Sequence, residues 1–414
     1  MQNDKNVKNN KKSKNNGRMS NLYNKYVKKS KIRFSIPETL VIMTIVFGIG
    51  LIVGGVLMYW KRAFDSSKIS LNEFTATYNE IVDNYYQEVD KEELLEAGIS
   101  GMVRYLGDPY STYMSKDAAE DFNEDVEGTY QGIGAEIKYS EDNLPMIGRV
   151  FENSPAEKAG LKENDIILKV NDEDVTNKSL SDIASIVKGD KGTTVHITIR
   201  RDNDENEYEL TRGVVDNVSV TSEIIEKNNH KIGYIYISIF ASNTKKQFEK
   251  ELKHLEDNGI ESLIIDVRGN TGGYLTTVSD ILSMFMKNGE VIYQLRTKEK
   301  VEIIKDKTDE SRDYPVVILA DGGSASASEV LVGAFSETYN SQVVGTKTFG
   351  KGRVQKVFTL SSGALFKYTY QEWLTPNGNY IDQAGIIPDI EIAYEYNKDG
   401  IDNQKEKAIE VLSN

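Results

Sequence analysis

The chain has 414 residues, more than one ordinary hydrophobic core accommodates, which indicates two or three domains. Hydrophobic residues make up 39% and charged residues 28%, the proportions of a folded protein. Cysteine is absent, which excludes disulfides, thiolate catalysis and cysteine-ligated metals. The net charge of −14 is uneven, because the first 33 residues carry eleven Lys or Arg against Asp4 alone, leaving −24 on the remainder. A body this acidic repels phosphate backbones, so we expect no nucleic-acid partner.

An uncharged stretch of 21 residues follows the basic arm, which we place at residues 1–34. Leu40 to Trp60, LVIMTIVFGIGLIVGGVLMYW, would span about 30 Å as a helix, which matches the hydrocarbon core of a bilayer. The basic cluster before it predicts that the N-terminus stays in the cytoplasm. A cleaved signal peptide is the alternative, but Lys61 and Arg62 follow without a small-x-small cleavage pattern. We expect an uncleaved anchor over residues 35–61, with the rest of the chain extracytoplasmic.

Helical periodicity and then short alternating runs follow the anchor. The segments FTATYNEIVDNYY and LLEAGISGMVRYL predict a small helical region over residues 62–126. Over residues 127–213 alternating runs between glycines and polar turns predict strands, with helices only at Ala156 to Leu161 and Ser179 to Val187. The order and size of these elements, with SPAEKAGLKENDIILKVND from Ser154, resemble a PDZ domain, which is β-rich with two helices.

In PDZ domains a glycine loop offers backbone N–H groups to the terminal carboxylate of a peptide, which then pairs as an added strand. The resemblance places this loop at Gln131, Gly132, Ile133 and Gly134. Glycine suits such a loop because the backbone must approach the ligand closely. An ordinary glycine turn without a ligand is the alternative.

Strands and helices alternate over residues 214–396, which predicts an α/β core. The apolar runs KIGYIYISIF, SLIIDVRG and PVVILA predict buried strands, while TKKQFEKELKHLEDNG and LTTVSDILSMFM predict helices. The glycine loop DVRGNTGGYL could contribute N–H groups to an oxyanion site, and it lacks the spacing of a nucleotide loop. His230 and His254 have no recognisable triad partner, which disfavours Ser-His-Asp catalysis. Residues 397–414 form a C-terminal tail that reads as a short charged linker and helix.

Three serines, Ser324, Ser326 and Ser328, lie where a predicted strand passes into a helix. Ser326 and Glu329 fit a capping box, which explains the segment without catalysis. A helix N-terminus can also stabilise an oxyanion, so the same place can serve acyl transfer. These residues alone do not choose among the three serines.

Lys351 lies between two glycines, 25 positions after Ser326. Close packing of the glycines would bury its amine and lower the pKa from about 10.4 toward roughly 7 or 8, as a general base requires. On an extended chain Lys351, Arg353 and Gln355 share one face, so the Gln355 amide could orient the amine without adding a charge. A surface lysine in a glycine loop is the alternative.

Together these segments resemble the C-terminal processing peptidases, a serine/lysine family with an inserted PDZ domain. The resemblance covers about residues 70–396 and includes, in the family's order, GISGMVRYLGDPYSTYM, YQGIGAEI, SPAEKAGLKENDIILKV, DVRGNTGGYL, GGSASASE, GTKTFGKGRVQ, LTPNGNYI and GIIPDI. It implies a multidomain chain whose α/β protease core is of crotonase-like type. It assigns Ser326 as nucleophile, Lys351 as general base and Gln355 as the residue that orients the lysine.

The resemblance also implies an oxyanion hole made by the N–H of Ala327 and one N–H from the Gly272-Gly273 turn. The predicted protein is a membrane-anchored serine endopeptidase that recognises apolar C-terminal tails of extracytoplasmic proteins and cleaves them through an acyl-enzyme. The resemblance also implies that the PDZ domain gates the active site and that the protein forms a homodimer. We expect no cofactor and no metal. Two alternatives are a membrane-tethered PDZ scaffold with an inactive protease-like core, and a sensor whose α/β domain binds a small apolar ligand.

Overall fold

The computed structural model describes residues 35–65, 70–395 and 400–413. The basic arm predicted over residues 1–34 lies outside these ranges. The chain divides into two compact units, one ending at Leu95 and the other beginning at Glu96. Each unit has its own architecture and is described by itself.

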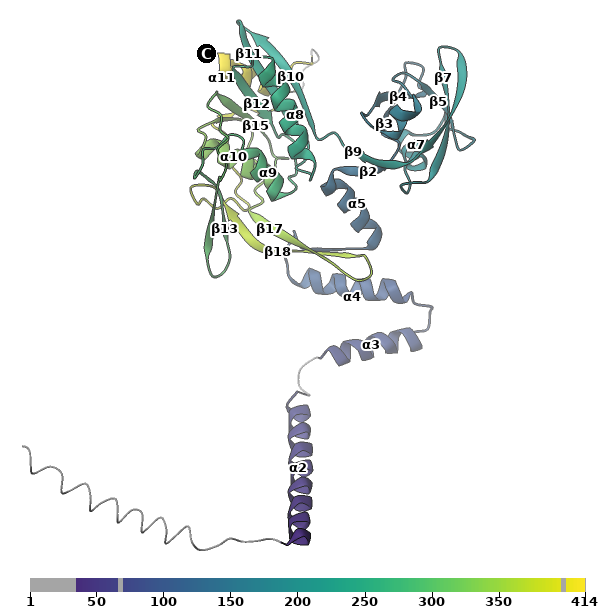
Figure 1. Ribbon diagram of the computed structural model, residues 1–414, viewed down its shortest axis with the longest axis vertical. Coiled ribbons are helices and arrows are strands. Elements are labelled where there is room, and N and C mark those ends of the chain that lie inside the picture. Colours follow the sequence, from purple (N-terminus) through teal and green to yellow (C-terminus); the bar gives the residue numbers. More distant parts are fainter. Residues whose placement is uncertain (1–34, 66–69, 396–399, 414) are drawn as a thin grey trace, which may run out of the picture. The chain divides into compact units, whose positions relative to one another are not determined.

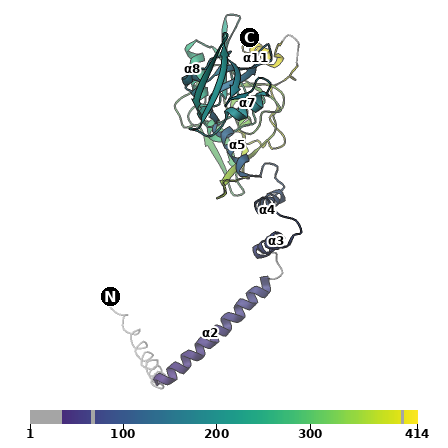
Figure 2. The ribbon, with the colours of Figure 1, turned by 90° about the vertical axis from the view of Figure 1, so that its right-hand side faces the viewer.

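The first unit is helical. Helix α2 (Ile36–Asp65) is one unbroken helix (Figure 2), and α3 (Leu71–Asn84) and the start of α4 (Lys91–Tyr105) follow it. Among the described residues, α2 alone is long and apolar enough to cross a membrane, over Ile36–Met58 with a mean hydropathy of 2.7. The predicted apolar helix and the two amphipathic helices after it are therefore present.

The second unit contains the predicted PDZ-like segment. Its six-stranded antiparallel sheet has the order β3-β4-β5-β7-β8, and β6 pairs with β5. The strands are β3 (Ala135–Tyr139), β4 (Pro145–Val150), β5 (Ile166–Val170), β6 (Glu173–Asp174), β7 (Thr194–Arg201) and β8 (Asp204–Thr211). Helices α6 (Pro155–Ala159) and α7 (Leu180–Val187) complete it. Alternate strand residues such as Ile197 and Ile199 are buried, which confirms the predicted alternation.

A short ribbon frames this segment at both of its ends. Strand β2 (Thr129–Gly132) enters it after helix α5 (Lys116–Glu127), and β9 (Gly213–Asp216) leaves it. The two strands pair antiparallel, with Gly132 opposite Gly213. The glycine loop begins with the last two residues of β2, Gln131 and Gly132, and is therefore anchored at its start.

The α/β core is a six-stranded sheet whose strands are parallel except for the first. The order is β10 (Val220–Lys227), β11 (His230–Ile237), β12 (Ser262–Asp266), β15 (Val316–Ala320), β16 (Gln342–Gly345) and β19 (Ile390–Glu391). Every residue of β12 and β15 is buried, because both faces of the sheet are covered. The predicted buried strands are confirmed.

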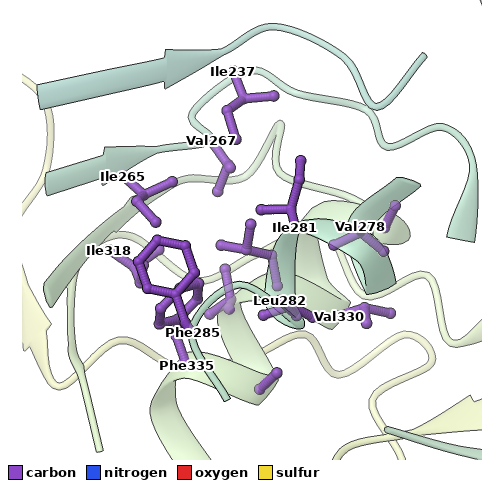
Figure 3. Packing of buried hydrophobic residues seen from close by; sticks show 14 of the residues in the cluster. Ile237, Ile265, Val267, Val278, Ile281, Leu282, Phe285, Ile318, Val330 and Phe335 are labelled. Carbon is purple, nitrogen blue, oxygen red and sulfur yellow. The ribbon is translucent and has the colours of Figure 1, made fainter. Parts of the chain in front are cut away.

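Helices pack on one face of this sheet around a large apolar cluster (Figures 1 and 3). They are α8 (Thr244–Asp257), α9 (Leu275–Leu282) and α10 (Ala327–Glu337). Ile265 and Ile318 point from the strands into this cluster, where Phe285 and Phe335 pack edge to face with ring centroids 5.1 Å apart. Helix α9 is shorter than its predicted segment, and the residues after Leu282 continue into the same cluster as turns.

Helix α11 (Asn403–Ser413) packs on the opposite face of the sheet, a contact that the sequence pattern did not predict. Its Ala408 and Ile409 join Ile264 and Val317 in a second apolar cluster. Arg268 bridges the sheet to this helix, because its guanidinium bonds Asp266 at 3.0 Å, Asp402 at 2.7 Å and Gln404 at 2.8 Å. The C-terminal segment therefore completes the core.

A second antiparallel sheet adjoins the start of α10. Its order is β1 (Thr112–Met114), β18 (Leu365–Leu374), β13 (Val291–Arg296) and β14 (Val301–Lys305), and β17 (Arg353–Thr359) also pairs with β18. The indole of Trp373 donates to the carbonyl of Lys351 at 2.8 Å. This sheet thus holds the glycine-flanked lysine in place.

Candidate active site

One cavity of about 610 Å³ brings together the candidate catalytic and oxyanion residues. They come from three places that are far apart in sequence: the start of α10, the loop after β12, and β17 with the segment that leads into it. The six residues are Ser326, Ala327, Gly272, Gly273, Lys351 and Gln355.

The three serines have different surroundings. Ser324 is buried and its hydroxyl donates to the carbonyl of Val267 at 2.8 Å, while the buried Ser328 hydroxyl donates to the carbonyl of Asn270 at 2.7 Å. Ser326 lies between them, is only half-buried and lines the cavity. Of the three serines, Ser326 alone lines this cavity.

Ser326 has a strained backbone. Its φ of 55° and ψ of −113° lie in a region that non-glycine residues rarely adopt, at a cost of about 1–3 kcal/mol. Half of the predicted capping box is present: the Ser326 N–H donates to Glu329 Oε2 at 2.9 Å, while the N–H of Glu329 donates to the Ser326 carbonyl at 2.9 Å. The surroundings that hold this conformation place the side chain at the N-terminus of α10, where the helix dipole favours negative charge.

Glu329 does more than cap the helix. It is fully buried and also accepts hydrogen bonds from the N–H of Lys351 at 2.8 Å, the N–H of Gly350 at 2.7 Å and the hydroxyl of Thr348 at 2.6 Å. Four donors compensate this carboxylate for the loss of water. One side chain therefore fixes the backbones of both Ser326 and Lys351. The capping-box pattern was the only sequence signal for this residue.

The glycines around Lys351 allow the close packing that the sequence predicted. A Cβ on Gly350 would lie 2.8 Å from the backbone nitrogen of Gly385, and one on Gly352 would lie 2.7 Å from that of Asp382. The Lys351 amine is half-buried and lies 5.3 Å from the centroid of the Tyr110 ring.

This environment lowers the pKa of the Lys351 amine. Burial is the largest cause, and the positive charge of Lys367 adds to it, while Glu329 and Asp108 act in the opposite direction. Among the described residues, no carboxylate forms a salt bridge with Lys351. The direction of this shift is the one that a general base requires.

Gln355 lines the same cavity, but its amide nitrogen donates to the carbonyl of Arg353 at 3.1 Å and to Thr369 Oγ1 at 3.2 Å. The pairing register shifts between Val354 and Gln355, which interrupts the expected alternation of faces. Arg353 instead pairs with Asp382 at 2.9 Å. No hydrogen bond within the described part of the chain joins Gln355 to Lys351, so its orienting role stays a prediction.

The glycine turn lies against the start of α10. A Cβ on Gly272 would lie 2.9 Å from the Ser326 Cβ, and Gly272 and Gly273 have φ angles of 109° and 139°. The N–H of Gly272 donates to Asn270 Oδ1 at 2.8 Å. Among the described residues, the N–H groups of Gly273 and Ala327 have no hydrogen-bond acceptor, which makes these two the available donors.

The predicted carboxylate loop borders a separate cavity of about 340 Å³ between β3 and α7. Gly132 and Ile133 contribute to its lining, while Gln131 is tied away from it because its Oε1 accepts the N–H of Lys191 at 2.8 Å. Gly134, at the end of this loop, has a φ of 80°, and Tyr130 also lines the cavity. Burial raises the pKa of the Tyr130 phenol to about 12.

Gly134→Ala is expected to destabilise the PDZ-like segment and to distort this loop. The new Cβ would lie 2.3 Å from the Ser154 Cβ, in addition to the roughly 1–2 kcal/mol cost of a positive φ. Gly160→Ala is the matched control, because Gly160 has a similar φ of 88° and no atom within 4 Å of the new Cβ. Hydrogen exchange of β3 and β4 measures the difference, and equal acceleration in both variants would refute the packing argument.

Comparison with known protein families gives three matches. The model of peptidase family S41 matches residues 231–392, a PDZ domain model matches residues 146–201, and a model of the activating protease CtpB N-terminal domain matches residues 57–118. The three matches follow the order of the helical region, the PDZ-like sheet and the α/β core.

Individual proteins are also similar. The carboxy-terminal processing protease CtpB of Bacillus subtilis (strain 168) is 39% identical over 327 residues, which cover 78% of this chain and 68% of that protein. A probable CtpA-like serine protease of Staphylococcus haemolyticus (strain JCSC1435) is 40% identical over 319 residues, 76% of this chain and 63% of that protein. The chain thus spans about two thirds of the length of these relatives.

A solved structure supports the fold. A putative S41 protease from Bacteroides fragilis NCTC 9343 superimposes with a TM-score of 0.50 at 18% identity, covering 80% of this chain and 91% of that chain.

Proposed function

Because this chain belongs to peptidase family S41, among the carboxy-terminal processing proteases, we propose that it is a serine endopeptidase that uses Ser326 and Lys351 to cleave protein tails. The observation that carries the proposal is the shared cavity, in which a strained helix-start serine, a half-buried lysine and a glycine turn come together. A scaffold with an inactive core gives no reason to maintain this strain or to bury an amine without a salt bridge. We also assign the α/β core to the crotonase-like type.

The first half of the reaction forms an acyl-enzyme. The neutral Lys351 amine removes the hydroxyl proton as Ser326 Oγ attacks the peptide carbonyl carbon. The oxyanion accepts hydrogen bonds from the N–H groups of Ala327 and Gly273, with the N-terminus of α10 behind them. Collapse of this intermediate breaks the C–N bond, and Lys351 returns its proton to the leaving amine.

The second half restores the enzyme. Water attacks the ester carbonyl while Lys351 accepts a proton from it. The ester bond to Ser326 then breaks, Lys351 returns that proton to Ser326 Oγ, and the new C-terminal carboxyl group leaves and ionises. Gln355 lies in the cavity wall and orients the lysine amine, as the family resemblance implies. Since Gly272 is bonded to Asn270, Gly273 serves as the second oxyanion donor.

Substrate selection belongs to the PDZ domain. The cavity between β3 and α7 accepts an apolar C-terminal side chain, because Ile137, Leu180 and Val187 are among the residues that line it. Gln131, Gly132, Ile133 and Gly134 form the carboxylate loop, and a tail pairs with β3 as an added strand. The PDZ domain gates the active site, and the terminal regions form a homodimer.

The proposed location rests on α2, which is long and apolar enough to cross a membrane, and on the basic residues before it. As a single-pass anchor with a cytoplasmic N-terminus, α2 would leave the PDZ and protease domains outside the cytoplasm, where the substrates would be the tails of extracytoplasmic proteins.

Paired peptides test the proposed function. The detergent-solubilised full-length protein is incubated with an unstructured peptide that ends in an apolar residue, once with a free carboxylate and once with a C-terminal amide. We expect internal cleavage, detected by mass spectrometry, that is at least about tenfold faster for the free carboxylate, because the loop donors favour an anion. Equal rates would argue against tail recognition, and a complete lack of cleavage would favour the scaffold alternative.

A further inference from the structure

The catalytic cavity contains a second lysine to which neither the sequence patterns nor the family resemblance gives a role. Lys367 lies in β18, opposite Thr112 of β1 on one side and opposite Val357 of β17 on the other. It lines the same cavity as Ser326 and Lys351. Strands on both sides of β18 hold its backbone in position.

Lys367 has an apolar partner in place of a carboxylate. Its half-buried ammonium lies 5.1 Å from the centroid of the Phe122 ring of α5, an arrangement that suits a cation. Within the described residues, Lys367 takes part in no salt bridge. Its charge is therefore not neutralised by a direct ion pair.

The acidic groups near Lys351 are engaged elsewhere. Glu329 accepts its four hydrogen bonds, and Asp108 accepts the Ser111 hydroxyl at 2.5 Å and lies 3.6 Å from the guanidinium of Arg353. Asp382 also pairs with Arg353. Asp125 of α5 and Lys367 are further charged residues in the cavity lining.

Burial lowers the pKa of both amines, and the charge of Lys367 further lowers the pKa of Lys351. Because repulsion between two cations is mutual, the cavity favours a state in which only one of the two amines carries a proton. The base role requires Lys351 to be the neutral one.

We propose that Lys367 is a positioning residue whose ammonium, held against Phe122, keeps the amine of Lys351 neutral and ready to accept the Ser326 proton. The proposal rests on the proposed Ser326–Lys351 mechanism. Lys367 exchanges no proton during the reaction: the proton passes from Ser326 Oγ to Lys351 Nζ and then to the leaving amine. Repulsion between the two cations also favours this second transfer.

A pH profile separates this role from a structural one. We measure kcat/KM of the detergent-solubilised full-length protein against pH for the wild type, Lys367→Met and Lys367→Arg. At low pH kcat/KM should fall because Lys351 becomes protonated, and we call this part of the profile the acidic limb. Removing the charge of Lys367 should move the acidic limb to higher pH, so that kcat/KM at a given low pH falls about tenfold for each pH unit of the shift. At high pH, where Lys351 is neutral in both proteins, kcat/KM should stay near that of the wild type. Arginine retains the charge and should keep the limb in place.

Lys356→Met is the matched control, because Lys356 is an exposed lysine on the neighbouring β17. Solvent and salt screen its charge, so its limb should coincide with that of the wild type. An unmoved limb in Lys367→Met, or an equal loss at every pH in both Lys367 variants, would overturn the proposal.

A second measurement does not require catalysis. In Ser326→Ala, the modification of Lys351 by an amine-selective acylating reagent is followed against pH by mass spectrometry. Adding Lys367→Met should shift this profile to higher pH, and an unchanged profile would refute the role of Lys367. The result is independent of whether the protein cleaves peptides, so failure of the proposed function and failure of this inference are distinguishable.

Discussion

Ser326→Ala is expected to lower kcat/KM for peptide cleavage by about 10⁴-fold or more, and Lys351→Met by a similar factor. The alanine removes the attacking oxygen, and the methionine keeps the volume of the lysine side chain but cannot accept a proton. The two losses should not add in the double variant, because the residues act as one unit. Initial rates with a free-carboxylate peptide, and covalent labelling by a serine-reactive phosphonate mapped by mass spectrometry, measure both effects.

Ser324→Ala is the matched control for the nucleophile. Ser324 lies two positions away, but its hydroxyl is buried and bonded to the carbonyl of Val267. Its loss should cost about 1–3 kcal/mol of folding stability and leave the phosphonate label on Ser326. If Ser324→Ala abolished labelling while Ser326→Ala retained it, the assignment of the nucleophile would be wrong.

The sequence predicted the elements of the core because both faces of its sheet are covered. Strands such as Ser262–Asp266 and Val316–Ala320 therefore read as unbroken apolar runs. The order of the motifs also led to the prediction of Ser326 as the nucleophile, although the residue types around it fit a simple capping box. The close packing of the backbone on both sides of Lys351 could also be predicted, because it depends only on the missing side chains of the two flanking glycines.

Contacts between distant segments could not be predicted in this way. Lys367 lies in an ordinary alternating strand, and its position in the cavity depends on a register with Thr112, more than 250 residues earlier. Arg268 meets Asp402 across 134 positions. The shared face predicted for Lys351 and Gln355 assumed strict alternation, which the irregularity after Val354 interrupts.

Glu329→Gln is expected to reduce kcat by about 10²-fold or more and to destabilise the core. The amide oxygen can replace one carboxylate oxygen, but the amide NH₂ must face two donors, either the N–H groups of Ser326 and Lys351 or the groups of Gly350 and Thr348. Each unsatisfied donor costs about 1–3 kcal/mol. Relief of this conflict separates the loops, and a displacement of about 1 Å at the reacting atoms is enough for a 10²-fold loss.

Glu337→Gln on the same helix is the matched control. Glu337 also accepts two hydrogen bonds, from Asn377 N–H at 2.7 Å and Asn379 Nδ2 at 2.9 Å, but both bonds are solvent-exposed, so water can replace them. Its kcat and urea midpoint should remain near those of the wild type.

The pH profile gives the Glu329 variant a separate signature. The Glu329 charge raises the pKa of Lys351, so its removal lowers that pKa and should move the acidic limb to lower pH. This direction is opposite to that expected for Lys367→Met. Opposite shifts would establish that Glu329 raises the pKa of the Lys351 amine and that Lys367 lowers it. If Glu329→Gln had the kcat, the stability and the acidic limb of the wild type, Glu329 would not organise the site.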